Sequence, residues 1–101
     1  MKTKDFIKQL ERSPGIIQKV NNIGDQSVGV FFYYDHISIY GDKLDNDKIT
    51  LNFSKRGGTD DIYMRPSDFK QIHENPDDKN MIYIDLKNED RWLIHLYGDA
   101  T

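Results

Sequence analysis

The chain has 101 residues with no cysteine, 14 basic and 17 acidic residues, and a formal net charge of −3 at pH 7. This length predicts a single domain over residues 1–101, and the lack of cysteine excludes disulfides, thiolate zinc sites and a cysteine nucleophile. The mild negative charge disfavours nucleic acid as a partner, and no apolar run is long enough for a signal peptide or membrane span, so we expect a cytoplasmic protein.

The first segment, residues 3–12, has the apolar spacing of a helix. Phe6, Ile7 and Leu10 fall on one helical stripe, and a Ser-Pro-Gly sequence follows the segment. Thr3 is the expected N-cap, because threonine oxygens accept hydrogen bonds from the free amides of the first turn. We therefore predict a helix from Thr3 to Arg12.

The next apolar segment, residues 16–23, is ambiguous. Its spacing suits a helix that begins after Pro14 and ends at Gly24. Its β-branched residues suit a strand that turns within residues 21–25. The strand is our preferred interpretation.

Residues 28–42 predict a first β-hairpin. A two-residue turn at Asp35 and His36 would place Tyr34 opposite Ile37 and would pair the residues on either side in the same register. One face of this hairpin would then hold Val30, Phe32, Tyr34, Ile37 and Ile39.

Two further hairpins are predicted in the same way. A turn at Gly57-Gly58 places Phe53 opposite Ile62 and Leu51 opposite Met64. Near the end of the chain, a loop of residues 88–90 gives three predicted pairs, which are Leu86 with Trp92, Ile84 with Ile94, and Ile82 with Leu96. All three predicted hairpins have one clean apolar face.

The segment between the last two hairpins, RPSDFKQIHENP, predicts a short helix. Ser67 or Pro66 would begin it, and Phe69 and Ile72 would face the sheet. Residues 42–48 and 75–80 are expected to be polar loops. The predicted fold is α+β, an antiparallel meander of six or seven strands with both helices packed on one face, which strong coiling would curl towards a half-barrel.

The face of the predicted sheet away from the helices is rich in tyrosine. Five of the six tyrosines fall on it. Tyrosine suits surfaces that are exposed to solvent in the free protein and buried in a complex. The residues expected to contact a partner are Phe31, Tyr33, Tyr40, Tyr63, Arg65, Tyr83, Arg91 and Tyr97. The alternative is ordinary sheet packing, because aromatic cross-strand pairs also stabilise sheets.

We find no motif for a catalytic, cofactor or metal site. Asp42, Asp45 and Asp47 lack the glycine and glutamate spacing of a calcium loop, so they indicate a solvated turn. Asp85 and His95 are expected to be diagonal neighbours on the tyrosine-rich face, which would be a contact without a catalytic site.

The sequence therefore predicts a non-enzymatic domain that binds another protein, or a second copy of itself, without a cofactor or metal. Its size and composition are typical of accessory proteins of bacteria and their mobile elements, many of which inhibit or neutralise one protein. A module that binds single-stranded nucleic acid or a small ligand on the same rings is the alternative. An enzyme of an unrecognised type is the third class.

Overall fold

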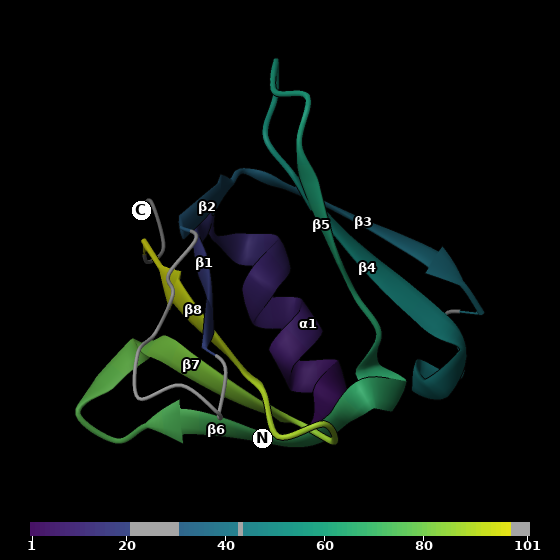
Figure 1. The fold of residues 1–101 in the computed structure, drawn as a ribbon, viewed down its shortest axis with the longest axis vertical. Coiled ribbons are helices and arrows are strands. Elements are labelled where there is room, and N and C mark those ends of the chain that lie inside the picture. The colour runs from purple at the N-terminus through teal and green to yellow at the C-terminus, as the bar shows by residue number, and fades with distance from the viewer. Residues whose placement is uncertain (21–30, 43, 98–101) are drawn as a thin grey trace.

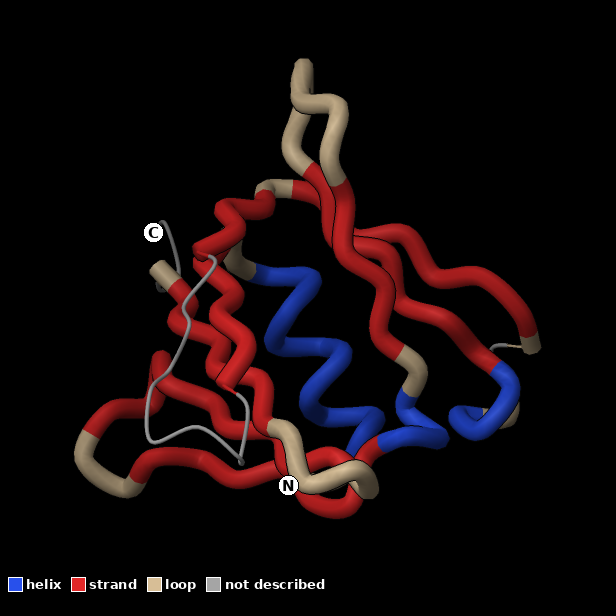
Figure 2. Tube along the Cα trace, viewed as in Figure 1, coloured by secondary structure: helices blue, strands red, loops and turns tan. Residues whose placement is uncertain are grey.

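The computed structural model describes residues 1–20, 31–42 and 44–97 of the chain. These residues form an α+β fold in which eight strands make two separate antiparallel sheets and one helix lies between them (Figures 1 and 2). The predicted α+β class is confirmed. The single meander is wrong, and neither sheet closes towards a barrel.

Helix α1 spans Thr3–Arg12, as predicted, and buries Phe6, Ile7 and Leu10. The predicted N-cap is wrong, because Lys2 occupies that position and makes no side-chain cap. The Lys2 carbonyl accepts hydrogen bonds from the backbone N–H groups of Asp5 and Phe6, at 3.1 and 3.0 Å, so the first turn closes through the main chain.

The larger sheet has five strands in the order β2-β1-β8-β7-β6. Their bounds are β1 Gly15–Val20, β2 Phe31–Tyr34, β6 Phe69–Asn75, β7 Asp78–Leu86 and β8 Arg91–Leu96. The strand preferred for the ambiguous segment is confirmed over Gly15–Val20, and the turn predicted at residues 21–25 lies outside the described residues. Because β1 lies between β2 and β8, it joins the early part of the chain to its last strand.

The smaller sheet has three strands in the order β3-β4-β5, with bounds β3 His36–Gly41, β4 Ile49–Ser54 and β5 Asp61–Met64. Short 3-10 turns η1 (Asn46–Lys48) and η2 (Pro66–Asp68) precede β4 and follow β5. The predicted register of β4 and β5 is confirmed, with Leu51 opposite Met64 and Phe53 opposite Ile62. Gly57 has a φ of 76° in the connecting turn, a conformation that glycine adopts without strain.

The hairpin predicted at Asp35 and His36 is wrong, because the chain changes sheets there. Tyr34 pairs with Gly15 in the larger sheet, whereas Ile37 pairs with Phe53 in the smaller one. The Asp35 backbone N–H donates to the Ser54 carbonyl and its carboxylate accepts from the Arg56 N–H, both at 3.0 Å. The inward-facing apolar residues change from even to odd positions at this point, so Tyr34 and Ile37 face the same core from two different sheets.

The register predicted for β7 and β8 is wrong by two residues. Ile82 pairs with Ile94, and Ile84 pairs with Trp92. The turn closes earlier than predicted, because the Leu86 N–H donates to the Asp90 carbonyl at 2.9 Å and Glu89 takes a φ of 72°. A shift of two residues preserves side-chain parity, so the predicted apolar face is still the inner one.

The helix predicted before the last hairpin is also wrong. Only the η2 turn is helical, and Phe69–Asn75 is strand β6. The register shifts between Phe69 and Gln71, and this bulge turns Phe69 towards the same side as Ile72. Their three-residue spacing therefore resembles a helix although the backbone is extended. The predicted polar loop at residues 75–80 is mostly strand, since Asn75 pairs with Asp78.

One core lies between the two sheets and α1. Its largest fully buried side chains are Phe6, Ile17, Tyr34, Leu51, Phe53, Ile82, Ile84 and Ile94. Phe6 contacts Phe69 edge-on at 6.0 Å between ring centroids, and Tyr34 contacts Phe53 edge-on at 5.0 Å. Within the described ranges, the chain has no helix with the length and apolar character needed to traverse a bilayer.

Candidate interaction surface

The predicted contact residues are divided between the two sheets. Phe31, Tyr33, Tyr83, Arg91 and Tyr97 lie on strands of the larger sheet or directly after β8, whereas Tyr40 and Tyr63 lie on the smaller sheet and Arg65 directly follows β5. The outer faces of the sheets point away from α1 on opposite sides of the molecule (Figure 1). The expectation that these residues form one surface is therefore wrong.

The outer face of the larger sheet carries a band of apolar side chains. Strand pairing aligns Phe31, Gln18, Leu93, Tyr83 and His73 across all five strands, and aligns Tyr33, Ile16, His95 and Met81 in the next row. We call the apolar members of these rows, together with the adjacent Tyr97, the apolar stripe: Ile16, Phe31, Tyr33, Met81, Tyr83, Leu93 and Tyr97. Three of them, Ile16, Met81 and Leu93, were not among the predicted contact residues, and strand order was needed to place Ile16 beside Tyr33.

The end of the apolar stripe at β2 is the most exposed. Phe31 is 68% exposed, Tyr97 53% and Tyr33 37%, while the aliphatic members are half-buried. The rings of Tyr33 and Tyr97 lie 5.6 Å apart at a tilt of 34°, and the Lys55 ammonium lies 5.2 Å from the Tyr33 ring centroid. These contacts hold the Tyr33 ring against its neighbours without covering Phe31.

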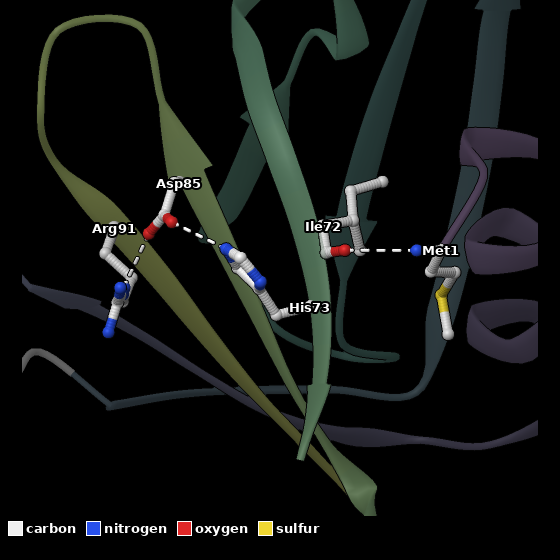
Figure 3. Close-up of polar contacts among 5 residues, drawn as sticks. All are labelled: Met1, Ile72, His73, Asp85 and Arg91. Carbon is white, nitrogen blue, oxygen red and sulfur yellow. Dashed lines mark hydrogen bonds and ion pairs between the residues drawn. The ribbon is translucent and has the colours of Figure 1, made fainter. Parts of the chain in front are cut away.

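The other end of this face is a network of polar side chains (Figure 3). The Asp85 carboxylate accepts a 2.7 Å hydrogen bond from Arg91 Nε through one oxygen and lies 2.8 Å from His73 Nε2 through the other. The hydrogen bond from Arg91 is the main reason that the pKa of Asp85 lies below its ordinary value. The expected neighbour of Asp85 is wrong, because His95 pairs with Met81 farther along the sheet.

Tyr83 joins the network to the apolar stripe. The Arg91 guanidinium lies 5.6 Å from its ring centroid, and its hydroxyl accepts a hydrogen bond from Asn75 Nδ2 at 3.3 Å. Tyr83 is half-buried by these neighbours. It therefore anchors the stripe at β7, while the freely exposed rings lie at β2 and β8.

The outer face of the smaller sheet is polar. Asn52 is only 6% exposed at the centre of this face, and its amide donates to Asp61 at 3.2 Å. A hydrogen bond with the Asp61 carboxylate is the main reason that the pKa of Tyr63 is raised. Tyr40 and Tyr63 are well exposed, at 55% and 58%, but their neighbours in the sheet are Thr50, Ser38, Asn52 and Asp61.

The described residues offer no cluster of side chains for metal binding. No group of three or more His, Asp or Glu side chains in residues 1–20, 31–42 and 44–97 is placed to hold a metal ion. Asp42 and Asp45 accept hydrogen bonds from the backbone N–H groups of Leu44 and Asp47, both at 3.0 Å, so they hold the turn before β4.

Comparisons of the chain with protein-family models, with curated proteins and with solved structures give no match. The assignment of the candidate surface therefore depends on the geometry of this chain alone.

Proposed function

We propose that this domain binds another protein, or a second copy of itself, through the apolar stripe on the outer face of the larger sheet. The observation that supports this proposal most strongly is the exposure of Phe31, Tyr33 and Tyr97 beside half-buried aliphatic side chains. Large contiguous apolar patches are uncommon on the surface of monomeric proteins. Aromatic side chains contribute most of the binding energy in many interfaces.

The composition of the apolar stripe suits a protein partner. Tyrosine and phenylalanine provide a large contact area at a small cost in conformational entropy, and the Tyr hydroxyl groups stay compatible with water before binding. The ion pair between Asp85 and Arg91 borders the stripe and would lie at the polar rim of such an interface. If the partner contacts the apolar stripe through its own functional surface, the domain would block that surface and inhibit the partner.

The test compares two double variants, each of which removes two aromatic rings from one of the opposite faces. Phe31→Ala/Tyr33→Ala removes the exposed end of the apolar stripe, and Tyr40→Ala/Tyr63→Ala is the matched control on the smaller sheet. Each is used with the wild type to capture proteins from a lysate of the natural host cells, and thermal unfolding is measured alongside. We expect the stripe variant alone to lose the captured protein while both variants keep about the same melting temperature. Loss of capture by the control alone would contradict the proposal.

A second candidate, binding of single-stranded nucleic acid, is favoured by the cations that lie over two rings of the stripe. Lys55 lies over Tyr33, and Arg91 lies over Tyr83. Bases stack on such rings, and neighbouring cations contact phosphates. A fluorescent oligothymidine titration distinguishes the two candidates, because nucleic-acid binding would weaken steeply with salt whereas contact through apolar rings would not.

A further inference from the structure

The outer face of the smaller sheet is almost free of charge, although 31% of the chain is Asp, Glu, Lys or Arg. Strands β3, β4 and β5 contain one such residue between them, Asp61. The outward-facing residues, read from the strand pairing, are His36, Ser38, Tyr40, Thr50, Asn52, Ser54, Asp61 and Tyr63. Hydroxyl, amide and aromatic groups therefore make up this surface, which points away from α1 (Figure 1).

Two exposed rings flank the centre of this face. Tyr40 lies opposite Thr50 and Tyr63 lies opposite Asn52, so β4 runs between the two tyrosines. Their backbone positions are separated by two strand spacings across the sheet and by two residues along it, which together amount to about 12 Å. We call Tyr40, Thr50, Asn52, Asp61 and Tyr63 the small-sheet platform.

The carboxylate of Asp61 is held beside the Tyr63 ring by neutral groups. Asn52 is only 6% exposed, and its Nδ2 donates a 3.2 Å hydrogen bond to Asp61. The Tyr63 hydroxyl also hydrogen-bonds with this carboxylate. Asp61 itself is exposed, and a carboxylate has room for about four hydrogen bonds. The platform therefore offers a fixed acceptor for a ligand hydroxyl group next to an open aromatic ring.

These features match the chemistry of a neutral sugar. A pyranose whose hydroxyl groups are equatorial has a flat face of C–H groups, which packs on the electron-rich face of an aromatic ring. Its rim of hydroxyl groups donates to carboxylates, and such bonds to a charged acceptor are the stronger kind. The phosphates of a nucleic acid would find basic side chains only beyond the strand ends, at Lys48, Lys55 and Arg65.

We propose that the small-sheet platform binds a neutral oligosaccharide of pyranose units with equatorial hydroxyl groups. One unit stacks on Tyr63 and donates a hydroxyl hydrogen bond to Asp61, and a second unit stacks on Tyr40. The two rings are too far apart for neighbouring units, so at least one unit lies between them over β4. Asn52 is a positioning residue, because it is buried and acts through Asp61. This site is independent of the apolar stripe and of the function proposed for it.

The proposal is tested by titrating cellohexaose, a chain of six β-linked glucose units, into the isotopically labelled protein. Backbone amide shifts are the readout, and cellobiose is the matched probe that is too short to reach both rings. We expect saturable shifts at residues 38–40, 50–52 and 61–63 with cellohexaose. Cellobiose should bind about tenfold more weakly, because it stacks on one ring only.

Variants of the two rings complete the test. Tyr40→Ala and Tyr63→Ala should each weaken cellohexaose binding about tenfold while the melting temperature is kept, since both side chains are exposed. Tyr63→Phe retains the ring and should bind within about threefold of the wild type. Phe31→Ala/Tyr33→Ala should leave the affinity unchanged, which separates this site from the apolar stripe.

Four results would overturn the proposal. They are no saturable shifts with cellohexaose, equal affinity for cellobiose and cellohexaose, loss of binding in the Phe31→Ala/Tyr33→Ala variant, and tighter binding of oligothymidine than of cellohexaose at residues 38–40 and 61–63.

Discussion

The outer faces of the two sheets carry similar numbers of exposed aromatic rings but different surroundings. Phe31 and Tyr33 on the larger sheet are continuous with Ile16, Leu93 and Met81. On the smaller sheet, Tyr63 lies beside the buried amide of Asn52 and the carboxylate of Asp61. The exposed rings have apolar neighbours on the larger sheet and polar neighbours on the smaller one, which is why we propose the larger sheet as the interaction surface.

The largest loss of stability is expected on the inner face of the smaller sheet. Phe53 is fully buried, whereas Tyr63 on the neighbouring strand points outward and is 58% exposed. We expect Phe53→Ala to lower the free energy of unfolding by about 3–5 kcal/mol, because it leaves a cavity in the core. Tyr63→Ala should lower it by less than about 1 kcal/mol. Denaturant unfolding measures both values, and equal losses would show that the two faces are assigned incorrectly.

A smaller loss of stability is expected at Gly15 in the larger sheet, where the neighbouring atoms leave no room for a side chain. A Cβ atom at Gly15 would lie 2.6 Å from the His95 carbonyl oxygen and 3.2 Å from the Tyr34 ring. Gly15→Ala should therefore destabilise the protein by about 1–3 kcal/mol through overpacking. Thermal unfolding of this variant beside wild type provides the check. Unchanged stability would mean that β1 and β8 can separate more easily than their pairing indicates.

Asp85 gives a pH-dependent effect on the polar part of the larger sheet. Folding lowers the pKa of Asp85, so its carboxylate stabilises the folded state above the ordinary value of 3.8, and this contribution is lost as the pH falls through the lowered value. Asp85→Asn should cost at most about 1 kcal/mol at neutral pH. The difference from wild type should shrink in acid. Unfolding curves across the pH range would contradict this account if the difference stayed constant well below pH 3.8.

The smallest effect, and one of opposite sign, is expected at Tyr34. Its hydroxyl is buried without a hydrogen-bond partner among the described residues, and burial raises the pKa of this group well above its ordinary value. Tyr34→Phe keeps the ring contact with Phe53 and removes the unsatisfied hydroxyl, so stability should stay the same or rise by up to about 1 kcal/mol. A clear loss of stability in denaturant would show that the hydroxyl is hydrogen-bonded.

Which residues face the core was predictable from the sequence, but strand partners were predictable only where a short turn joins the two strands. The alternation around Phe53 and Met64 fixed both the inner face and the register, because a glycine turn joins two adjacent strands. The same reasoning failed at Asp35. There too the apolar residues shift between even and odd positions, but the shift marks a crossing between two sheets instead of a turn within one. It also failed at Phe69, where a bulge produces helix-like spacing in a strand.

The candidate surface was predicted only in part, for the same reason. Phe31, Tyr33 and Tyr97 were correctly placed on an outer face, since an exposed position depends on parity alone. Their separation from Tyr40 and Tyr63 depends on the order of strands in two sheets, which is set by contacts far apart in the sequence. The pairing of β1 with β2, which places Ile16 opposite Tyr33, and the pairing of β1 with β8, which places Gln18 opposite Leu93, have no local signal.

The most direct test of the central claim is the molar mass in solution of the wild type and of Phe31→Ala/Tyr33→Ala. Light scattering over a concentration series would be measured for each protein alone and with the captured partner. Our account predicts that the wild type rises above the 11.9 kDa of one chain in at least one of these conditions, while the variant stays at that mass. A variant that assembles as well as the wild type would contradict the assignment of the apolar stripe as the interaction surface.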